Sequence, residues 1–166
     1  MRIVSPLALL LIERSKRFMS DLNTLKWDRR FLKLAKLVAS WSKDPSTQTG
    51  AVLVASDRTI LSVGYNGFPK GMNDSEKLYA NRETKYSRIV HCEMNAILNA
   101  KRSVEGSTLY TWPLGSCDRC VVHMIQAGVK TFVFPALPKK LRKRWSESLW
   151  RTKTYIEEAK LYWREI

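Results

Sequence analysis

Apolar residues recur at steps of three and four between positions 27 and 41, with charged side chains at the positions between them. This period predicts an amphipathic helix that begins near Lys26 and that Pro45 stops. The buried stripe of this helix is predicted to contain Trp27, Phe31, Leu34, Val38 and Trp41. Its charged outer face is predicted to carry Asp28, Arg29, Arg30, Lys33 and Lys36.

Two β-rich runs follow this helix, at residues 51–55 and 59–63, and the short polar stretch 56–58 joins them. Together they predict a β-hairpin. The glycine-rich loop 64–71 comes next, and its letters GYNGFPKG do not match a phosphate-loop fingerprint. The polar segment 73–88 has little periodicity, and we expect it to form a flap over a site.

The second half of the chain alternates helix-like and strand-like segments. Residues 94–101 read as helix, 107–112 as strand, 117 onwards as helix, and 129–134 as strand. The last segment, 145–166, reads as a charged helix with an inner face of Leu149, Ile156, Ala159 and Trp163. This alternation predicts right-handed crossovers and an α/β fold, with a mixed sheet covered on both faces.

The first twenty residues differ in composition from the rest of the chain. Residues 6–12 form a short apolar run without the small-residue cleavage site that a signal peptide has after its apolar core. A more ordinary opening begins at Met19. We predict that residues 1–20 form an N-terminal extension that need not be ordered, and that residues 21–166 form the functional domain.

Bulk composition limits the class of protein. A chain of 166 residues is long enough for one domain with a sizeable core. Its three cysteines leave no disulfide framework, which is typical of a cytoplasmic protein. No apolar run reaches membrane-spanning length.

The formal net charge of +14 has three interpretations: a polyanionic partner, a phosphorylated small substrate, or dispersed charge that serves solubility. The basic residues are scattered, with local clusters at 14–17 and 139–144. This scatter favours the second and third interpretations over a nucleic-acid partner.

The candidate chemistry lies in the letters HCE at 91–93 and CDRC at 117–120. One imidazole and two thiols, from His91, Cys117 and Cys120, can give three ligands to a zinc ion. The fourth tetrahedral position is then left for water, as in catalytic zinc sites. Glu93, two residues from the first ligand, is the predicted proton carrier, and this arrangement matches the pattern of zinc-dependent deaminases.

The spacing of these residues predicts their placement on helices. Residues at i and i+2 do not share a helix face, so His91 and Glu93 converge only if His91 lies at the first turn. Cys117 and Cys120 do share a face, and at a helix N-terminus the free N–H groups and the dipole favour their thiolates. Two helix starts should therefore point at one metal.

Other interpretations of these residues are weaker. The Cys117–Cys120 pair alone would suit a redox motif, but the upstream His-x-Glu favours zinc. Cys92 follows His91 directly, so we expect its side chain to turn away and fill the core. His123 lies deeper in the second helix, and we expect it to be a packing or surface residue.

From about Trp27 onwards, the chain resembles the deoxycytidylate (dCMP) deaminases of the cytidine deaminase superfamily. The matching segments are 42–52 (SKDPSTQTGAV), 64–69 (GYNGFP), 91–97 (HCEMNAI), Cys117–Cys120 and 125–128 (IQAG). The metal motif marks the whole superfamily, whereas the first two segments favour its mononucleotide branch. Two positions depart from the family pattern: Ser116 stands where proline usually precedes the first cysteine, and Cys92 stands where alanine is usual.

The resemblance implies a three-layer α/β/α fold with a mixed central sheet, and a zinc-dependent deaminase domain over residues 21–166. It implies hydrolysis of dCMP to dUMP and ammonia, which supplies dUMP for thymidylate synthesis. Zinc would lower the pKa of a water, and Glu93 would carry protons. Asn66 is expected to bind the nucleoside, and Lys43 and Ser46 are expected near the phosphate.

The resemblance also implies a homo-oligomer, and regulation by dCTP and dTTP as in part of the family. Three rival functions remain. The first is a deaminase of cytosine or adenine bases in single-stranded DNA or tRNA, which the basic charge would suit. The second is a deaminase of free nucleosides or bases, and the third is a zinc-stabilised binding module without activity. The presence of Glu93 argues against the third.

Overall fold

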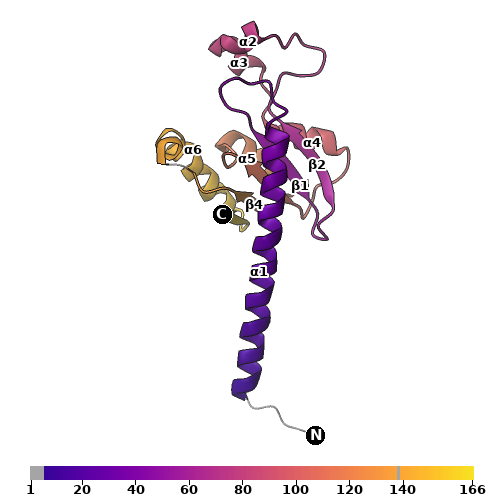
Figure 1. Ribbon diagram of the computed structural model, residues 1–166, viewed down its shortest axis with the longest axis vertical. Coiled ribbons are helices and arrows are strands. Elements are labelled where there is room, and N and C mark those ends of the chain that lie inside the picture. Colours follow the sequence, from indigo (N-terminus) through magenta and orange to yellow (C-terminus); the bar gives the residue numbers. More distant parts are fainter. Residues whose placement is uncertain (1–5, 138) are drawn as a thin grey trace.

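A five-stranded mixed sheet forms the centre of the computed structural model, which describes residues 6–137 and 139–166 (Figure 1). In sheet order the strands are β2 (Ile60–Tyr65), β1 (Gly50–Val54), β3 (Thr108–Trp112), β4 (Thr131–Phe134) and β5 (Tyr162–Glu165). Strand β1 pairs antiparallel with β2 and β3, whereas β4 pairs parallel with β3 and β5. The predicted hairpin and the two later strands are confirmed.

Helices cover both faces of this sheet. One face carries α1 (Pro6–Ala39), and the other carries α4 (Cys92–Ala100), α5 (Asp118–Gln126) and α6 (Lys139–Glu158). On the α1 side, Val38 packs in a core with Val52 and Val133 of the sheet. On the other side, Leu53 and Leu109 pack with residues of α4, α5 and α6. The predicted three-layer α/β/α fold is confirmed.

Helix α1 is longer than the sequence pattern predicts. It begins at Pro6 rather than near Lys26, and it continues through Met19 without a break. Figure 1 shows its N-terminal part extending beyond the sheet. The boundary at residue 20 between an extension and the domain stays a prediction, and residues 1–5 lie outside the described part of the chain.

Two positions on the predicted amphipathic helix differ from expectation. Trp41 does not belong to the buried stripe, because it follows the end of α1 and is 51% exposed. Asp28 does not lie on the charged outer face, because it is 1% exposed and accepts hydrogen bonds from Tyr110 and Arg164. A buried carboxylate needs such partners, since desolvation without them is costly.

The segment predicted as a flap folds into two short helices, α2 (Glu76–Ala80) and α3 (Arg82–Arg88). Asn81 separates them, and its side chain caps α3 by accepting a hydrogen bond from Thr84 N at 2.9 Å. Tyr79 stacks on Phe68 with ring centroids 4.2 Å apart, which ties α2 to the glycine-rich loop.

The end of the chain differs from the predicted long helix. Helix α6 stops at Glu158, and Tyr162–Glu165 forms strand β5 beside β4. Of the predicted inner face, Ile156 is buried and Trp163 stacks on Phe134, whereas Ala159 is exposed. Arg164 reaches Asp28 of α1 from this strand, with Nε 2.7 Å from Oδ2. The last strand thus fastens the first helix to the sheet.

Two glycines, one on each strand, let the layers approach closely at the open end of the hairpin. A Cβ atom at Gly50 would collide with backbone atoms of Ala35 and Ala39 in α1. A Cβ atom at Gly64 would collide with backbone atoms of α4, including the Cys92 carbonyl. Only glycine permits such backbone contact between a strand and a helix. At these two points the hairpin contacts α1 and α4 without intervening side chains.

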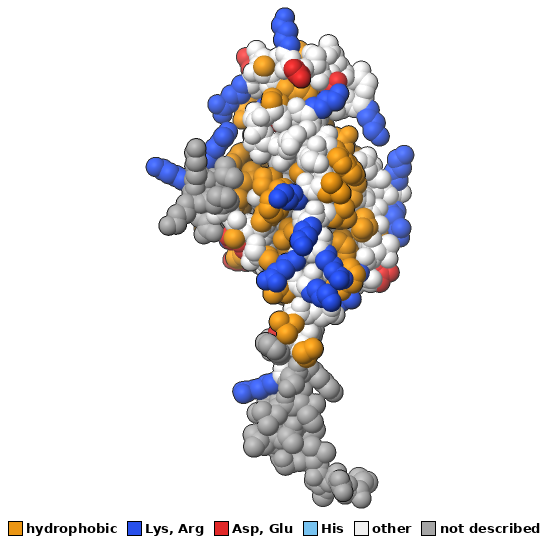
Figure 2. Space-filling model, in the orientation of Figure 1, with side chains coloured by type: hydrophobic (Ala, Val, Ile, Leu, Met, Phe, Trp, Pro, Cys, Tyr) orange, Lys and Arg blue, Asp and Glu red, His pale blue; other side chains and the backbone are white. Residues whose placement is uncertain are grey.

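Basic side chains are spread over the surface in Figure 2, both on the domain and along α1. Hydrophobic side chains also reach this surface in places. Among the described residues, no helix is long and apolar enough to cross a membrane.

Candidate active site

The start of α4 brings a histidine and a carboxylate together. His91 is the N-cap residue, with extended backbone angles (φ −71°, ψ 156°), and Glu93 lies in the first turn. Because His91 precedes the helical residues, its side chain is free of the i, i+2 constraint that would place it on another face. The predicted position of His91 at the first turn is confirmed. Glu93 is 5% exposed.

The start of α5 presents the two cysteines. Cys117 is the N-cap residue, and its Sγ accepts a hydrogen bond from the backbone N–H of Cys120 at 3.4 Å. Free N–H groups and the positive end of the helix dipole lie at this end, and both stabilise thiolates. The predicted placement of the Cys-x-x-Cys pair at a helix N-terminus is therefore confirmed.

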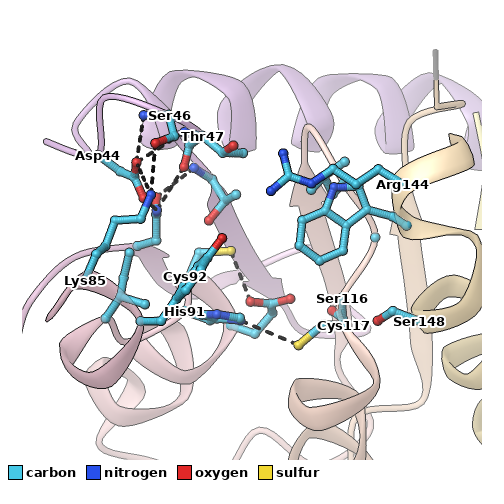
Figure 3. Close-up of a pocket in the computed structure, with 18 of the residues that line it drawn as sticks. Asp44, Ser46, Thr47, Lys85, His91, Cys92, Ser116, Cys117, Arg144 and Ser148 are labelled. Atoms are coloured by element: carbon cyan, nitrogen blue, oxygen red, sulfur yellow. Dashed lines mark hydrogen bonds and ion pairs between the residues drawn. The ribbon is translucent and has the colours of Figure 1, made fainter. Parts of the chain in front are cut away.

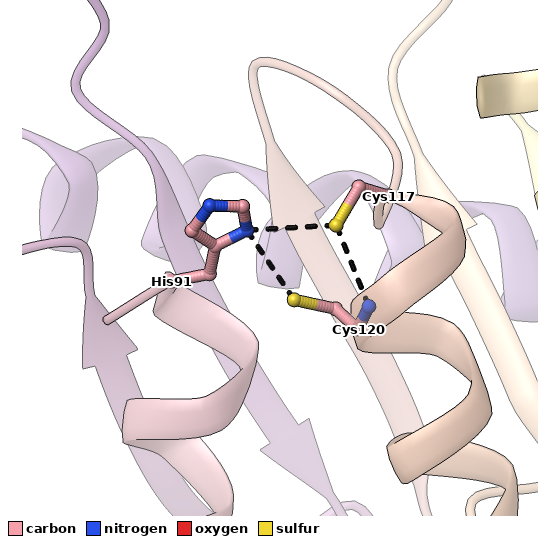
Figure 4. A group of neighbouring side chains, drawn as sticks. All are labelled: His91, Cys117 and Cys120. Atoms are coloured by element: carbon pink, nitrogen blue, oxygen red, sulfur yellow. Dashed lines mark hydrogen bonds between the residues drawn. The ribbon is translucent and has the colours of Figure 1, made fainter. Parts of the chain in front are cut away.

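The two helix starts converge on one point (Figure 4). His91 Nδ1 lies 3.5 Å from Cys117 Sγ and 3.3 Å from Cys120 Sγ. The three candidate ligand atoms lie within 4.8 Å of one another. One nitrogen and two sulfurs form a donor set that suits zinc, and three protein ligands leave a fourth position open. The residues present therefore fit a catalytic zinc ion.

The pKa shifts of the three side chains also agree with a site for a divalent metal ion. The hydrogen bond with the Cys120 thiol, followed by that with His91, lowers the pKa of Cys117. The same hydrogen bond and burial raise the pKa of Cys120. The hydrogen bond with Cys117 also raises the pKa of His91. Two thiols this close do not both ionise without a nearby cation, and a divalent metal supplies that charge.

Cys92 and His123 lie outside the three-atom cluster. Cys92 is 2% exposed, and its Sγ lies 3.2 Å from Glu93 Oε2. Burial raises the pKa of this thiol well above its ordinary value. His123 is exposed, and its Nδ1 lies 2.7 Å from the carbonyl oxygen of Arg119. These positions agree with the predictions of a core filler and a surface residue.

A pocket of about 300 Å³ opens above the cluster (Figure 3). This volume is at the lower end of the range for small-molecule sites. His91, Glu93 and Cys117 line one side of the pocket. The remaining walls come from the 44–49 loop, from α2 and α3, from the loop before α5, and from the first half of α6. Aromatic side chains in these walls are Tyr79, Tyr86 and Trp145.

A buried network supports the wall of the pocket that is formed by the 44–49 loop and α3. Lys85 of α3 donates to Asp44 Oδ1 at 3.1 Å and to Ser46 Oγ at 3.0 Å. Asp44 also accepts from the backbone N–H groups of Ser46 and Thr47. Sequence reasoning missed Lys85, since the segment 73–88 carries no pattern that sets one lysine apart.

Of the two residues predicted near a phosphate, only Ser46 lines the pocket. Lys43 is not among the lining residues. Its Nζ lies 2.7 Å from Asp74 Oδ2 at the surface, and 66% of its side chain is exposed. That hydrogen bond raises the pKa of Lys43. The resemblance indicated only the loop, and the direction of a side chain on an irregular loop cannot be deduced from sequence.

Asn66 lines the pocket but uses its side chain within the protein. Its Oδ1 accepts from Thr49 N at 2.7 Å, and its Nδ2 donates to the Thr47 carbonyl at 2.9 Å. Nδ2 also lies 3.3 Å from Asp44 Oδ2. These bonds fix the 44–49 loop, and contact between Asn66 and a nucleoside stays a prediction.

The loop that carries Cys117 is held by α6. Ser116 is buried, and its carbonyl accepts a hydrogen bond at 2.9 Å from Thr152, which is 1% exposed. Ser148 Oγ donates to Asp118 Oδ1 at 2.8 Å and accepts from Asp118 N at 3.2 Å. Although Ser116 replaces the proline usual at this position, its backbone is fixed by a buried partner.

The fold and this site together define a zinc-dependent deaminase. A profile described as the cytidine and deoxycytidylate deaminase zinc-binding region matches residues 25–136. The chain belongs to this family, whose members are hydrolytic deaminases, and zinc is the metal of this region.

Several relatives share much of the sequence. The chain is 41% identical to an uncharacterized deaminase of Aliivibrio fischeri over 134 residues, which cover 81% of this chain and 89% of the relative. It is 35% identical to a probable deoxycytidylate deaminase of Caenorhabditis elegans, over 92% of this chain and 76% of the relative. It is 39% identical to the deoxycytidylate deaminase of Homo sapiens, over 66% of this chain and 65% of that protein.

Solved structures show the same fold. The dCMP deaminase of cyanophage S-TIM5 in its apo form has a TM-score of 0.66 and 21% identity, covering 85% of this chain and 98% of the phage chain. The same phage enzyme in complex with dCMP and dUMP has a TM-score of 0.65 and 22% identity, covering 85% and 97%.

Proposed function

We propose that this protein hydrolyses dCMP to dUMP and ammonia and thereby supplies dUMP for thymidylate synthesis. The observation that carries the proposal is the position of Glu93, buried in the turn after His91 and lining the same pocket as Cys117. Relatives named as deoxycytidylate deaminases support the choice of substrate, as does the phage structure with dCMP and dUMP.

His91, Cys117 and Cys120 would hold the zinc ion, since their donor atoms converge on one point. Zinc at such a site lowers the pKa of water towards neutrality and so supplies the nucleophile. His91 and Cys117 lie at N-cap positions, so the backbone of two helices fixes the direction of their side chains. Cys120 is held one turn into α5.

Glu93 is the proposed catalytic residue. Its carboxylate takes a proton from the attacking water and delivers it to the pyrimidine ring nitrogen as the new C4–O bond forms. It then takes the proton of the new hydroxyl group at C4 and delivers it to the amino group, so that the C4–N bond breaks, ammonia leaves and a C4 carbonyl remains. Burial keeps bulk water from competing for these protons. The Cys92 thiol, 3.2 Å from Oε2, restricts the rotation of this carboxylate from the core side.

The three residues predicted to contact the substrate differ in how they lie relative to the pocket. Ser46 lines the pocket, and its hydroxyl accepts from Lys85, so its own proton remains available to a substrate oxygen. Asn66 lines the pocket and fixes the 44–49 loop through the hydrogen bonds of its side chain. Lys43 lies outside the pocket, so its charge acts on a phosphate only at longer range.

One assay panel tests the proposal. The purified zinc protein is given dCMP, CMP, deoxycytidine, dCTP and a cytosine-containing oligonucleotide, and ammonia release is measured for each. We expect dCMP to be turned over far better than deoxycytidine, with little activity on the oligonucleotide. Preference for unphosphorylated deoxycytidine would overturn the proposal.

Deamination of bases in a polynucleotide is the second candidate, because the net charge is +14. A protein that contacts several phosphates of a single strand loses affinity steeply with salt, with a log–log slope of about −0.7 per contact. An enzyme that binds one phosphate has only a mild salt dependence. Efficient deamination of the oligonucleotide, steeply salt-dependent and with dCMP inert, would establish this second function.

Assembly and location complete the proposal. A homo-oligomer is supported by exposed aromatic residues: Trp41 and Tyr65 are 51% and 41% exposed and contact each other edge to face. A cytoplasmic location is supported by the three free cysteines.

Regulation by dCTP and dTTP is tested by adding each to the dCMP assay. Light scattering measures the oligomeric state.

A further inference from the structure

The first turns of α6 form one wall of the pocket. Arg144, Trp145, Ser148 and Leu149 are all lining residues. Figure 3 shows the guanidinium of Arg144 pointing into the space between α6 and the loop of Ser46 and Thr47. It therefore faces the pocket from the side opposite the buried Asp44–Lys85 network.

Three cationic side chains line this pocket: Arg82, Lys85 and Arg144. The ammonium group of Lys85 already has partners within the protein, because it donates hydrogen bonds to the buried Asp44 carboxylate and to Ser46. In the described part of the chain, Arg82 and Arg144 have no carboxylate partner, and each lies near an aromatic ring. Two positive charges are thus available to an anionic ligand.

Arg144 is the better placed of the two for a dianion. Its segment, 139–144, reads KKLRKR, and the first turn of α6 contains no acidic residue. Arg82, by contrast, precedes Glu83 in the first turn of α3, and Glu76 lies in the first turn of the neighbouring α2. The local charge is therefore more positive around Arg144.

Helix α6 also fixes how far Arg144 lies from the metal cluster. Two turns beyond Arg144, Thr152 bonds the carbonyl of Ser116, the residue before Cys117. One turn beyond it, Ser148 bonds Asp118, the residue after Cys117. Helix α6 thus carries the guanidinium of Arg144, and it is also hydrogen-bonded to the residues on either side of Cys117, a proposed metal ligand.

We propose that Arg144 determines specificity for a nucleoside monophosphate by binding its phosphate, an inference that rests on the proposed function. A guanidinium presents paired N–H donors in a plane that matches two phosphate oxygens. The rigid connection from Arg144 to Cys117 sets the distance between the phosphate and the reacting ring. A nucleoside without a phosphate would not use this contact.

The test compares kcat/KM for dCMP and for deoxycytidine in the full-length zinc protein and in Arg144→Gln. We expect Arg144→Gln to lower kcat/KM for dCMP by about 10- to 100-fold, the range for loss of a charged hydrogen bond. The value for deoxycytidine should stay close to that of the parent protein. Arg144→Lys keeps a point charge and should restore part of the loss.

Two further variants make the test specific. Lys143→Gln removes an adjacent exposed charge that does not line the pocket, and it should retain the preference for dCMP. Arg82→Gln removes the other free cation, and it should affect dCMP less than Arg144→Gln does. A loss confined to Arg82→Gln, or equal losses for both substrates in Arg144→Gln, would overturn the inference.

Zinc content and melting temperature of each variant show whether the fold is kept. If the parent protein itself shows no preference for dCMP over deoxycytidine, the proposed function fails, and this inference fails with it. If the parent prefers dCMP and Arg144→Gln keeps that preference, only this inference fails.

Discussion

The ammonium of Lys85 lies 3.1 Å from the carboxylate of Asp44, and the two side chains are only 8% and 4% exposed. The pair joins α3 to the loop that follows α1, across 41 residues of sequence. Both residues line the pocket. A charged pair in this setting is stable only while both partners are present, because either one alone would be a buried, uncompensated charge.

Replacing Lys85 with methionine should lower the free energy of unfolding by about 3–5 kcal/mol, since Asp44 would lose its cation inside the protein. Urea unfolding at neutral pH measures this change. Lys43→Met is the matched control: it breaks the exposed pair with Asp74 and should cost about 1 kcal/mol or less. Equal effects in the two variants would contradict a structural role for the buried pair.

Glu93→Gln should keep the fold and the zinc but lose about two to four orders of magnitude in kcat, because the amide cannot carry the protons. The measurements are elemental analysis, melting temperature and kcat on dCMP. If the variant lost its zinc instead, Glu93 would be a ligand, and its proposed role would be wrong.

The metal prediction concerns stoichiometry and ligand identity. Purified protein should contain about one zinc ion per chain, and chelation should abolish activity that added zinc restores. Cys117→Ser should lose the metal. His123→Ala removes the exposed histidine of the same helix and should retain both metal and activity. Zinc loss in the His123 variant, or zinc-free active protein, would refute the ligand assignment.

Tyr110 gives a prediction about alkaline pH. Burial, followed by the hydrogen bond to Asp28, raises the pKa of its phenol in the folded protein. An unfolded tyrosine has a pKa of about 10, so the folded state releases this proton later than the unfolded state. The stabilisation is therefore full below pH ~10 and is lost as pH rises towards the folded pKa.

Unfolding by urea at pH 8 and at pH 11 measures this effect. The parent protein should lose more stability between the two pH values than Tyr110→Phe, which has no phenol to ionise. Similar pH dependence in both proteins would show that other groups control alkaline stability.

The N-terminal part of α1 gives a prediction about truncation. Core contacts of α1 begin at about Trp27, whereas Met19 is 63% exposed. A chain that starts at Met19 should therefore match the full chain in melting temperature and in turnover of dCMP. A clear drop in either value would show that residues 1–18 belong to the working protein.

Local spacing explains which parts of the site could be predicted from sequence. Glu93 is two positions after His91, and Cys120 is three positions after Cys117, so a helix start is enough to fix the geometry of each pair. The strands of the hairpin were predictable for a similar reason, since each has a simple β-rich pattern.

Residues whose role depends on distant partners were not predictable. Asp28 looked like a solvent-facing charge because its partners, Tyr110 and Arg164, lie 82 and 136 residues away. Lys85 could not be singled out for the same reason, because its partner Asp44 lies 41 residues away. Strand β5 was read as helix, because Tyr162–Glu165 is short and charged and becomes a strand only by pairing with β4.

The close contacts at Gly50 and Gly64 have a consequence for how this protein tolerates change. At Gly64 the backbone of β2 meets the backbone of α4 directly, so no space is left there for a side chain. A single added methyl group at Gly64 would push α4 outward and displace His91 and Glu93, the proposed metal ligand and proton carrier, together. A glycine that lines no part of the pocket thus sets the position of two of its proposed functional groups.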